Sequence, residues 1–441
     1  MKKQIKIEER IKKFEKVIQV SGDKSISIRC VLLASQAIGK SKIYNLLESE
    51  DVINTLKSIK KLGINYKKFK KYYEINGYGL AGYDTKKKIK IDAGNSGTLA
   101  RLIMGLLIDS KKKVTIVGDN SLSRRDFSRV TEPLKRFGAN IISQKKKLPV
   151  EIKGSEFLRP IKYEEKIGSA QCKSAVMLAA LKTPGITKIS AKKSRNHTEL
   201  LFKELGIPIK VLRNSNHDYI ELRGLTNFKS FDYIVPGDIS SCAFFIVLTL
   251  LGNKSKLRIK NININSSRTG IIKILNKMNA KIKYLNKRKY KGEHIADILI
   301  ESKKNLIGIN CPKNLNSSAI DEFLVIFLVA AKARGISVFK NLGELNKKES
   351  PRLNIAVNFL KKIGIKVKRK NDDIKIYGKP NLILDGNYLI KNFRKDHRIF
   401  MMSCIAALTF GGMWTIHDSD SVNSSFPNFL SELKKLGAKI S

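Results

Sequence analysis

Apolar and polar positions follow one pattern that repeats six times along this chain. Each copy has a polar turn, a helix that is apolar nearly all round, a short β-rich run and an amphipathic helix. The copies end at nearly even spacing, at Gly63, Gly138, Gly206, Ala280, Gly364 and Gly437. Regular self-similarity is the signature of a repeated supersecondary unit. We therefore predict an α/β fold of six similar units, three in each half of the chain.

The two helices of each copy are expected to differ in burial. The first, such as IDEFLVIFLVAAKARG at 320–335, lacks a polar face and should be buried. The second has apolar residues at helical spacing and should be half exposed, as at Val52, Leu56, Ile59 and Leu62. The glycine that follows it suits a left-handed residue beyond the helix end. Short strands are predicted between the helices, for example over Lys113–Val117 and Ile336–Phe339.

Polar turns precede all six buried helices. They read DKS (23–25), GNSGT (94–98), SAQ (169–171), GDISS (237–241), IDE (320–322) and DHR (396–398). Helix N-termini present unpaired N–H groups and a positive dipole end, which suit phosphate or carboxylate. Ser, Asp and Asn there are also ordinary N-caps, and this reading stays open for Asp238 and Ser240. It does not explain the cations at the same turns, which are Lys24, Arg29, Arg101, Lys173 and Arg398.

A cation near a helix start opposes the dipole, so it needs an anionic ligand or a carboxylate partner. Further cations lie between the β runs and the second helices, at Arg124, Arg125, Arg195, Lys348 and Arg352. Two carboxylates, Asp321 and Glu349, lie among them. A carboxylate in a cationic site can serve as acid or base, although each alone would read as a salt bridge. The pattern favours a site for multiply anionic ligands.

Composition narrows the class of protein. With 441 residues, 42% of them apolar and 28% charged, the chain is long enough for two globular domains. No apolar run reaches the length of a membrane span. The net charge of +48 raises nucleic acid as a partner, but the basic residues are spread along the whole chain. Five scattered cysteines without CxxC spacing indicate a reducing compartment, without zinc or disulfides.

Ten short motifs carry a resemblance to a known family. They are SGDKSISIR (21–29), DAGNSGT (92–98), GDNSLSRR (118–125), SAQCKSA (169–175), SRNHTE (194–199), VPGDISSCAFF (235–245), IDEF (320–323), KKESPRL (347–353), DHR (396–398) and SFPNF (425–429). In this order the chain resembles the 5-enolpyruvylshikimate-3-phosphate synthases. The resemblance implies two similar domains of three βαβαββ-like units each, an inside-out α/β barrel, with the active site between them. It places the domains at 22–236 and at 1–21 plus 237–441, so that the chain crosses twice.

The resemblance also implies roles for individual residues. Those that would bind shikimate 3-phosphate are Lys24, Ser25, Arg29, Ser169, Ala170, Gln171, Arg195, Asp321 and Lys348. Those that would enclose phosphoenolpyruvate are Lys24, Gly97, Arg125, Gln171, Arg352 and Arg398. Asp321 would act as the base at the attacking 5-hydroxyl, Glu349 as the acid at the methylene carbon, and Lys24 as a third catalytic residue.

The implied reaction is addition of the 5-hydroxyl to C2 of phosphoenolpyruvate, followed by loss of phosphate from a tetrahedral intermediate. It belongs to the shikimate pathway to chorismate and aromatic amino acids. The resemblance implies no metal and no organic cofactor, and a cytoplasmic monomer without a nucleic-acid or membrane partner. Gly97 has no side chain to crowd the herbicide glyphosate, so we expect sensitivity to it.

Four positions depart from the family pattern. Ile28 stands where a polar residue is frequent, Asp126 and Pro351 stand where proline and aspartate are usual, and Ser424 stands where some branches carry lysine. At Pro351 we expect Ser350 to cap a helix with Pro351 as its first residue.

Two other functions remain as alternatives. One is the related UDP-N-acetylglucosamine enolpyruvyl transferase, which carries a reactive loop cysteine; none of Cys30, Cys172, Cys242, Cys311 and Cys404 suits that role. The other is a basic nucleic-acid-binding repeat protein, whose affinity would depend steeply on salt. Phosphate release from shikimate 3-phosphate and phosphoenolpyruvate separates all three.

Overall fold

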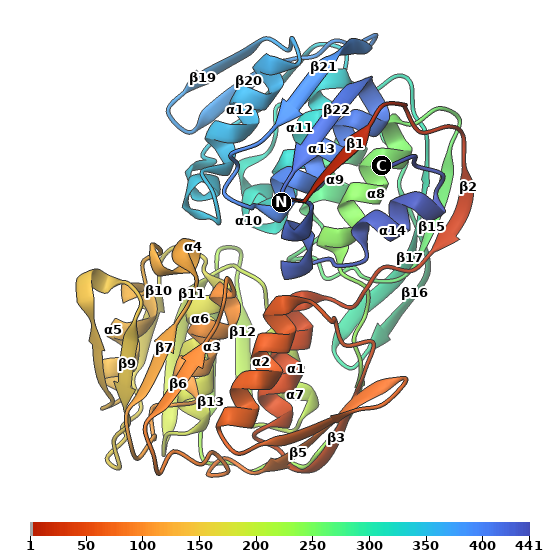
Figure 1. Cartoon of the computed structure of the whole chain (residues 1–441). Helices are drawn as coiled ribbons and strands as arrows, with labels where there is room; N and C mark the ends of the chain where they lie inside the picture. Colours follow the sequence, from red (N-terminus) through yellow and green to blue (C-terminus); the bar gives the residue numbers. More distant parts are fainter. Residues whose placement is uncertain (1–2) are drawn as a thin grey trace. The chain divides into compact units, whose positions relative to one another are not determined.

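The computed structural model describes residues 3–441, which divide into two compact units (Figure 1). Unit 1 comprises the chain up to Ser21, Pro236–Lys289 and His294–Ser441. Unit 2 comprises Gly22–Val235 and Tyr290–Glu293. Each unit has a hydrophobic core of its own. Compared with the domains expected at 22–236 and 1–21 plus 237–441, Pro236 belongs to unit 1 and the short segment Tyr290–Glu293 to unit 2.

Unit 2 is built on sheets of four strands, ordered β14-β3-β5-β4, β6-β7-β9-β8 and β10-β11-β13-β12. In each, the first two strands run parallel and the others antiparallel. The strands are β3 (Ile38–Tyr44), β4 (Asn65–Lys68), β5 (Tyr72–Tyr78), β6 (Ile89–Asp92), β7 (Val114–Val117), β8 (Asn140–Ser143), β9 (Val150–Lys153), β10 (Lys162–Glu165), β11 (Ile186–Lys192), β12 (Ile209–Arg213), β13 (His217–Arg223) and β14 (Asp232–Ile234). The helices are α1 (Lys24–Ala34), α2 (Glu50–Lys61), α3 (Gly97–Gly105), α4 (Asn120–Ser123), α5 (Ser128–Arg136), α6 (Ala170–Leu181) and α7 (His197–Glu204).

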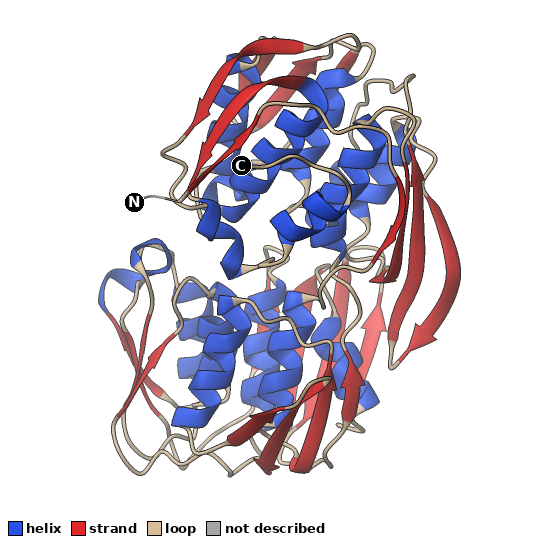
Figure 2. Ribbon diagram, turned by 45° about the vertical axis from the view of Figure 1, so that its right-hand side comes forward, coloured by secondary structure: helices blue, strands red, loops and turns tan. Residues whose placement is uncertain are grey.

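Unit 1 repeats the design with sheets ordered β16-β17-β15-β2, β18-β20-β19 and β1-β22-β21. Its strands are β1 (Gln4–Ile7), β2 (Glu15–Ile18), β15 (Lys256–Asn263), β16 (Lys283–Tyr290), β17 (Glu293–Glu301), β18 (Ile336–Phe339), β19 (Val367–Lys370), β20 (Asp373–Tyr377), β21 (Leu384–Ile390) and β22 (Gly411–His417). Its helices are α8 (Ile239–Leu251), α9 (Gly270–Lys277), α10 (Asn316–Ala319), α11 (Phe323–Lys332), α12 (Arg352–Lys362), α13 (His397–Phe410) and α14 (Phe429–Lys435). In both units the sheets lie outside and the helices inside (Figure 2).

Three strands complete repeats that begin elsewhere in the chain. β14 pairs in parallel with β3, β2 pairs in parallel with β15, and β1 pairs antiparallel with β22. The two N-terminal strands therefore complete sheets of unit 1, and β14 closes the first repeat of unit 2. Since β1 and β2 precede unit 2 in the chain and their partners β22 and β15 follow most of it, the chain has to pass between the units to complete these sheets.

The helices follow the hydrophobic pattern, and the predicted α/β repeat is confirmed. The first helix of each copy is buried along most of its length, as α8 is from Ile239 to Leu250. In the amphipathic α2, Val52, Leu56 and Ile59 are buried on one face. The glycines that end five of the copies all have positive φ, from 70° at Gly206 to 117° at Gly138. In the fourth copy Asn279 (φ 70°), not Ala280, takes that conformation, because asparagine tolerates it and alanine does not. No helix between residues 3 and 441 is both long enough and apolar enough to cross a bilayer.

Candidate active site

The start of α1 in unit 2 holds the first group of predicted residues. The Asp23 carboxylate caps the helix by accepting a hydrogen bond from the Ile26 amide at 2.9 Å. Lys24, the first helical residue, reaches Asp51 with Nζ 2.8 Å from Oδ2, and its side chain keeps 22% exposure. The cation at this helix start thus has the carboxylate partner that the dipole argument requires, and it remains accessible to a ligand.

Arg29 lies one turn further along α1 and is nearly buried. Its guanidinium donates to the carbonyl oxygen of Ser25 at 2.9 Å, to Oγ of Ser174 at 2.9 Å and to Oγ1 of Thr198 at 2.7 Å. These bonds join the starts of α1, α6 and α7. Arg195 is half-buried in the turn immediately before α7. The structure therefore groups Ser25 and Arg29 with the segment that carries Arg195.

The starts of α3 and α6 are joined by Arg101. Its Nη1 donates to the carbonyl oxygen of Gly97 at 3.2 Å and to Oε1 of Gln171 at 3.1 Å, while Gln171 donates to Thr98 Oγ1 at 2.9 Å. Arg125 donates from Nη2 to Asn95 Oδ1 at 3.1 Å, just before α3. A Cβ built on Gly97 would lie 2.6 Å from Arg101 Nη1 and 3.1 Å from Arg125 Nη1. Gly97, Gln171 and Arg125 are thus brought together, and the space at Gly97 is occupied by the two guanidiniums.

Ser169 and Ala170 form the start of α6. Ser169 is the N-cap, and its hydroxyl accepts from the Cys172 amide at 3.3 Å. The buried Glu165 carboxylate accepts from the amides of Gly168 and Ser169, the latter at 2.9 Å, and so fixes the preceding turn. Lys173 points the other way, with Nζ fully buried 2.6 Å from Glu199 and 3.8 Å from Asp218. It is part of an internal ion cluster, so a ligand could not reach it without rearrangement.

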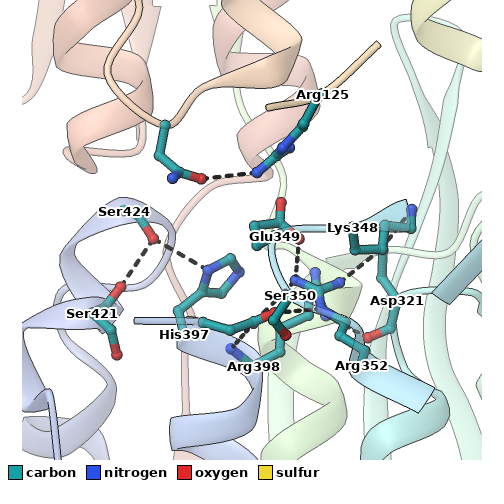
Figure 3. Close-up of polar contacts among 12 residues, drawn as sticks. Arg125, Asp321, Lys348, Glu349, Ser350, Arg352, His397, Arg398, Ser421 and Ser424 are labelled. Carbon is teal, nitrogen blue, oxygen red and sulfur yellow. Dashed lines mark hydrogen bonds and ion pairs between the residues drawn. The ribbon is translucent and has the colours of Figure 1, made fainter. Parts of the chain in front are cut away.

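In unit 1 the predicted residues gather around Arg352, whose side chain is 2% exposed (Figure 3). Arg352 donates from Nε to Asp396 Oδ2 at 2.9 Å and from Nη2 to Asp396 Oδ1 at 3.2 Å. Its Nη2 also lies 2.5 Å from Glu349 Oε2, and its Nη1 lies 3.5 Å from Asp321 Oδ1. One buried guanidinium therefore orders three carboxylates from three different loops.

Arg352 and Asp396 form a buried ion pair, and each shifts the pKa of the other. Burial raises the pKa of Asp396 and Glu349 adds to that rise, but the Arg352 charge and its hydrogen bonds outweigh both and hold the pKa below its usual value. Burial likewise acts to lower the pKa of Arg352, and the surrounding carboxylates of Asp396, Glu349 and Asp321 raise it further than burial lowers it. Both groups are therefore charged at neutral pH.

Asp321 is the point where the other predicted residues of unit 1 meet. Lys348 Nζ lies 3.3 Å from Asp321 Oδ1, and Arg398 donates from Nη1 to the Asp321 carbonyl oxygen at 2.7 Å. The side chains of Asp321, Lys348 and Arg398 keep 13%, 29% and 12% exposure, so a ligand can reach all three. The structure brings together every site residue that was predicted in this unit.

A buried network of polar side chains contacts Arg398 through Glu322, and no sequence pattern indicated it. Arg268 is 2% exposed and donates to Asp238 Oδ1 at 3.0 Å and to Ser240 Oγ at 2.8 Å. Ser240 donates in turn to Glu322, whose Oε1 lies 3.8 Å from Arg398 Nη1. Asp238 also caps α8, so the N-cap reading that was left open for it is correct. Arg268 lies at the turn before α9, where no local pattern marked it.

The predicted start of α12 was wrong by one residue. The helix begins at Arg352 with Pro351 as its N-cap, and Ser350 does not cap it. The Ser350 hydroxyl instead donates to Asp396 Oδ2 at 2.8 Å. A bond to a buried carboxylate is stronger than a neutral cap, which explains the difference. Ser424, another departure, lies 3.2 Å from Nδ1 of His397 at the start of α13.

Asp126 also has a local explanation. Its carboxylate accepts from the amide and the hydroxyl of Ser128, at 2.6 and 2.5 Å, where α5 begins. Its carbonyl oxygen accepts from Arg101 Nη2 at 3.3 Å. The aspartate side chain therefore orders the start of α5, and the contact with Arg101 comes from the backbone of this residue. Among residues 3–441 no group of three or more His, Cys, Asp or Glu side chains is placed to hold a metal ion.

Comparisons with known proteins first define the class. The enolpyruvyl transferase NikO from Streptomyces tendae matches with a TM-score of 0.77 over 100% of this chain and 99% of that chain, at 14% identity. The fold is therefore that of the enolpyruvyl transferases. An EPSP synthase structure from Acinetobacter baumannii matches with a TM-score of 0.87 at 34% identity, over 99% of each chain.

Sequence comparisons then give the family. The family model for EPSP synthase (3-phosphoshikimate 1-carboxyvinyltransferase) matches residues 8–433. The 3-phosphoshikimate 1-carboxyvinyltransferase of Ruthia magnifica subsp. Calyptogena magnifica is 40% identical over 96% of this chain and 95% of its own. That of Bacillus cytotoxicus is 38% identical over 95% of this chain and 97% of its own. The chain belongs to the EPSP synthase family. It is an enzyme of the shikimate pathway that transfers the enolpyruvyl group of phosphoenolpyruvate to shikimate 3-phosphate.

Proposed function

We propose that the helix starts of unit 2 bind shikimate 3-phosphate. Lys24, Ser25 and Arg29 would hold it from α1, and Ser169, Ala170 and Gln171 from α6, with Arg195 adding a second guanidinium. The support is chemical. Amides at the helix starts, hydroxyls and guanidiniums lie in one hydrogen-bonded group, and all of them can donate hydrogen bonds to the oxygens of a phosphate ester. The hydroxyls of Ser174 and Thr198 keep Arg29 in a fixed orientation.

We further propose that phosphoenolpyruvate is held by Lys24, Gly97, Arg125 and Gln171 of unit 2 and by Arg352 and Arg398 of unit 1. Asp321 and Lys348 of unit 1 would contact shikimate 3-phosphate as well. Arg352 would in addition set the geometry of the three carboxylates that it contacts, and Arg398 has more of its side chain open to a ligand.

The chemistry proceeds by addition and then elimination. The 5-hydroxyl oxygen bonds to C2 of phosphoenolpyruvate as Asp321 accepts the hydroxyl proton, and Glu349, in its protonated form, donates a proton to C3, which becomes a methyl group. The C2–O bond to phosphate then breaks as Asp321 returns its proton to the leaving phosphate. The Glu349 carboxylate takes a proton back from the methyl group, and the C2–C3 double bond forms again. Lys24, Lys348 and the arginines stabilise the charge on phosphate and carboxylate oxygens throughout.

The observation that carries these roles is the cluster of Asp321, Lys348, Glu349 and Arg352, in which acid and base candidates share one buried guanidinium. The test is phosphate release with both substrates. Asp321→Asn should lower kcat by about 10²-fold or more, since general base catalysis contributes about 10²–10⁴-fold. Asp385→Asn, on an exposed position of β21, is the matched control. Activity of Asp321→Asn equal to that control would remove Asp321 from the mechanism.

The cellular location, the oligomeric state and the partners of the protein are proposed on separate grounds. We propose a cytoplasmic location, because all five cysteines are free and buried, which suits a reducing compartment. We also propose that the protein is a monomer, as the family resemblance implies. Light scattering should give a mass near 49.7 kDa. We expect no salt-dependent binding to DNA or RNA, and no phosphate release with UDP-N-acetylglucosamine as acceptor. A dimer mass, or turnover of that acceptor, would contradict the respective statement.

A further inference from the structure

A short turn of unit 2 is carried by strands of unit 1. Tyr290–Glu293 belongs to unit 2, whereas β16 and β17, which lead into and out of it, lie in the sheet β16-β17-β15-β2 of unit 1. The chain therefore passes between the units at 289/290 and 293/294, in addition to 21/22 and 235/236. The family motifs gave no role to this turn.

The turn is anchored on unit 2 along its whole length. The Tyr290 hydroxyl accepts from the Ile234 amide at 2.9 Å, and its ring packs edge-on against Tyr233 with centroids 5.5 Å apart. Lys291 donates to the carbonyl oxygen of Asp232. A Cβ built on Gly292 would lie 3.4 Å from Leu200 in α7. The turn thus bridges β14 and α7.

Glu293 makes the contact that concerns the active site. One oxygen of its carboxylate lies 2.5 Å from Nδ1 of His197, the first residue of α7, and the two side chains are 1% and 0% exposed. A buried carboxylate is costly unless it is paired, so this contact has to be satisfied in the folded protein. An acceptor carboxylate assigns the donated proton to Nδ1 and fixes the plane of the ring. The pair therefore holds the start of α7 against the turn.

The first turn of α7 is bound at three consecutive residues. His197 pairs with Glu293, Thr198 accepts from Arg29 Nε at 2.7 Å and shares a 2.7 Å hydrogen bond with Ser174, and Glu199 pairs with Lys173 at 2.6 Å. Arg195 precedes this turn by two residues. A shift of His197 would therefore move the Arg195 loop on one side and the Thr198 contact to Arg29 on the other.

We propose that Glu293 is a positioning residue for shikimate 3-phosphate: through His197 it fixes the start of α7 and with it Arg195 and Arg29. The inference rests on the proposed assignment of these two arginines to that ligand. A displacement of about 1 Å in a binding group is enough to cost about 10²-fold in a preorganised site. Glu293 itself does not touch the substrate, so its loss should weaken binding without removing a reacting group.

The test uses Glu293→Ala in the full-length enzyme, with affinity for shikimate 3-phosphate measured by calorimetry and kinetics by phosphate release. We expect the Kd to rise by about 10-fold or more, while kcat at saturating shikimate 3-phosphate and the KM for phosphoenolpyruvate change by less than about 3-fold. Glu293→Gln keeps an oxygen that accepts from Nδ1–H and should restore the Kd to within about 3-fold of wild type. Glu301→Ala, at the exposed far end of the same strand, is the matched control and should behave as wild type.

A double variant distinguishes the proposed role of Glu293 from the proposed assignment of Arg195 to shikimate 3-phosphate. If Glu293 acts through Arg195, adding Glu293→Ala to Arg195→Ala should raise the Kd by less than it does in the wild-type background. A normal Kd in Arg195→Ala would show that Arg195 does not bind shikimate 3-phosphate. The effect of Glu293 through Arg29 would then be judged from the Kd of Glu293→Ala alone. A raised Kd in Arg195→Ala with a normal Kd in Glu293→Ala would overturn the inference and leave the assignment intact.

A purely structural role has a different signature. It predicts a lower Tm and a lower kcat from a smaller folded fraction, with the Kd unchanged, and that result would also overturn the inference. If Glu293→Ala does not fold, His197→Ala and His197→Asn carry the same comparison, because the asparagine amide keeps a donor near Nδ1. The alanine variant should then bind shikimate 3-phosphate more weakly than the asparagine variant, and equal affinities would count against positioning by this pair.

Discussion

The two units share one repeat but arrange their arginines differently. In unit 2, Arg29 and Arg101 donate to hydroxyl, amide and carbonyl oxygens at the helix starts. In unit 1, Arg352 lies within 3.5 Å of the carboxylates of Asp396, Glu349 and Asp321. Hydrogen bonds to hydroxyl, amide and carbonyl oxygens orient a guanidinium, whereas carboxylates also compensate its charge and are themselves held in place. The same fold therefore provides one surface suited to binding anions and another suited to holding acids and bases.

This comparison predicts that substitutions in the carboxylate cluster of unit 1 (Asp321, Glu349 and Asp396) act on turnover and stability, and that substitutions around Gly97 and Arg195 at the helix starts of unit 2 act on affinity. Glu349→Gln should have the largest effect. It removes the proposed proton donor while leaving Arg352 bonded to Asp396, so kcat should fall by about 10²–10⁴-fold with both KM values nearly unchanged. Phosphate release under saturating substrates measures it.

The matched control for this prediction is Glu344→Gln, in the same loop, where the carboxylate pairs with Lys347 at 2.8 Å and keeps 44% exposure. It should leave kcat within about 2-fold, since exposed pairs of this kind contribute about 0–1 kcal/mol. If Glu349→Gln changed only KM, the division of roles between the units would be wrong.

Asp396→Ala tests the stability of the carboxylate cluster. Removing one partner of a buried ion pair leaves the other charge without its main partner, so the free energy of unfolding should drop by about 3–5 kcal/mol. Urea unfolding followed by circular dichroism measures the loss. Asp420→Ala is the control, because its pair with Lys395 is exposed, and it should cost less than about 1 kcal/mol. Equal losses in the two variants would show that Arg352 does not need its carboxylate.

The effect of Asp396→Ala should also depend on pH. The pKa of Asp396 is lowered in the folded state, because Arg352 outweighs the opposing effect of burial. A carboxyl with a lowered folded pKa stabilises the protein above its unfolded pKa of about 3.9, and that contribution is lost as the pH falls through the folded value. The difference in unfolding free energy between wild type and variant should therefore be constant from about pH 7 to 5 and shrink below about pH 4. A difference that grew in acid would contradict the assigned direction.

Gly97→Ala is the sharpest change in unit 2. Its methyl group would lie 2.6 Å from Arg101 Nη1 and 3.1 Å from Arg125 Nη1, so both guanidiniums must move. An overpacked position costs about 1–3 kcal/mol. We expect the KM for phosphoenolpyruvate and the inhibitory concentration of glyphosate to rise, by about 5–150-fold where the whole cost falls on the ligand-bound state, with kcat less affected. Gly386→Ala, where the nearest atom to a new Cβ is 3.5 Å away, should change neither. An unchanged inhibitory concentration of glyphosate in Gly97→Ala would show that inhibition does not depend on the space at this position.

The smallest effect is expected from thiol reagents, which should act on neither unit. All five cysteines are buried, and burial raises the pKa of each, to about 11 for Cys311. Thiolates are the reactive form, so the native enzyme at pH 8 should react slowly with a disulfide reagent and keep its activity. Denaturation should release all five thiols. Rapid loss of activity on modification would reopen the alternative of a reactive loop cysteine.

Much of the fold was predictable because its signals are local. Helix burial follows from apolar positions that lie within one or two turns of one another, as in α2 and α8. The helix ends follow from single residues, since glycine adopts positive φ at low cost. The candidate anion sites were also predictable from local sequence, because the first turn of a helix has amides without partners in the helix, whatever packs around it. These properties depend on neighbours in the chain, and the sequence contains them directly.

The pairing of distant side chains was decided only by the tertiary structure. Arg29 with Thr198, Ser350 with Asp396 and His197 with Glu293 are separated by 169, 46 and 96 residues. Arg268 and Glu293 had no local pattern to mark them, because their partners lie far along the chain: 28 and 30 residues away for Arg268 and 96 residues away for Glu293. Sequence determined which residue types stand at each helix start and each strand. Only the packing of whole elements determined which buried charges face each other, since that depends on distances that no local periodicity encodes.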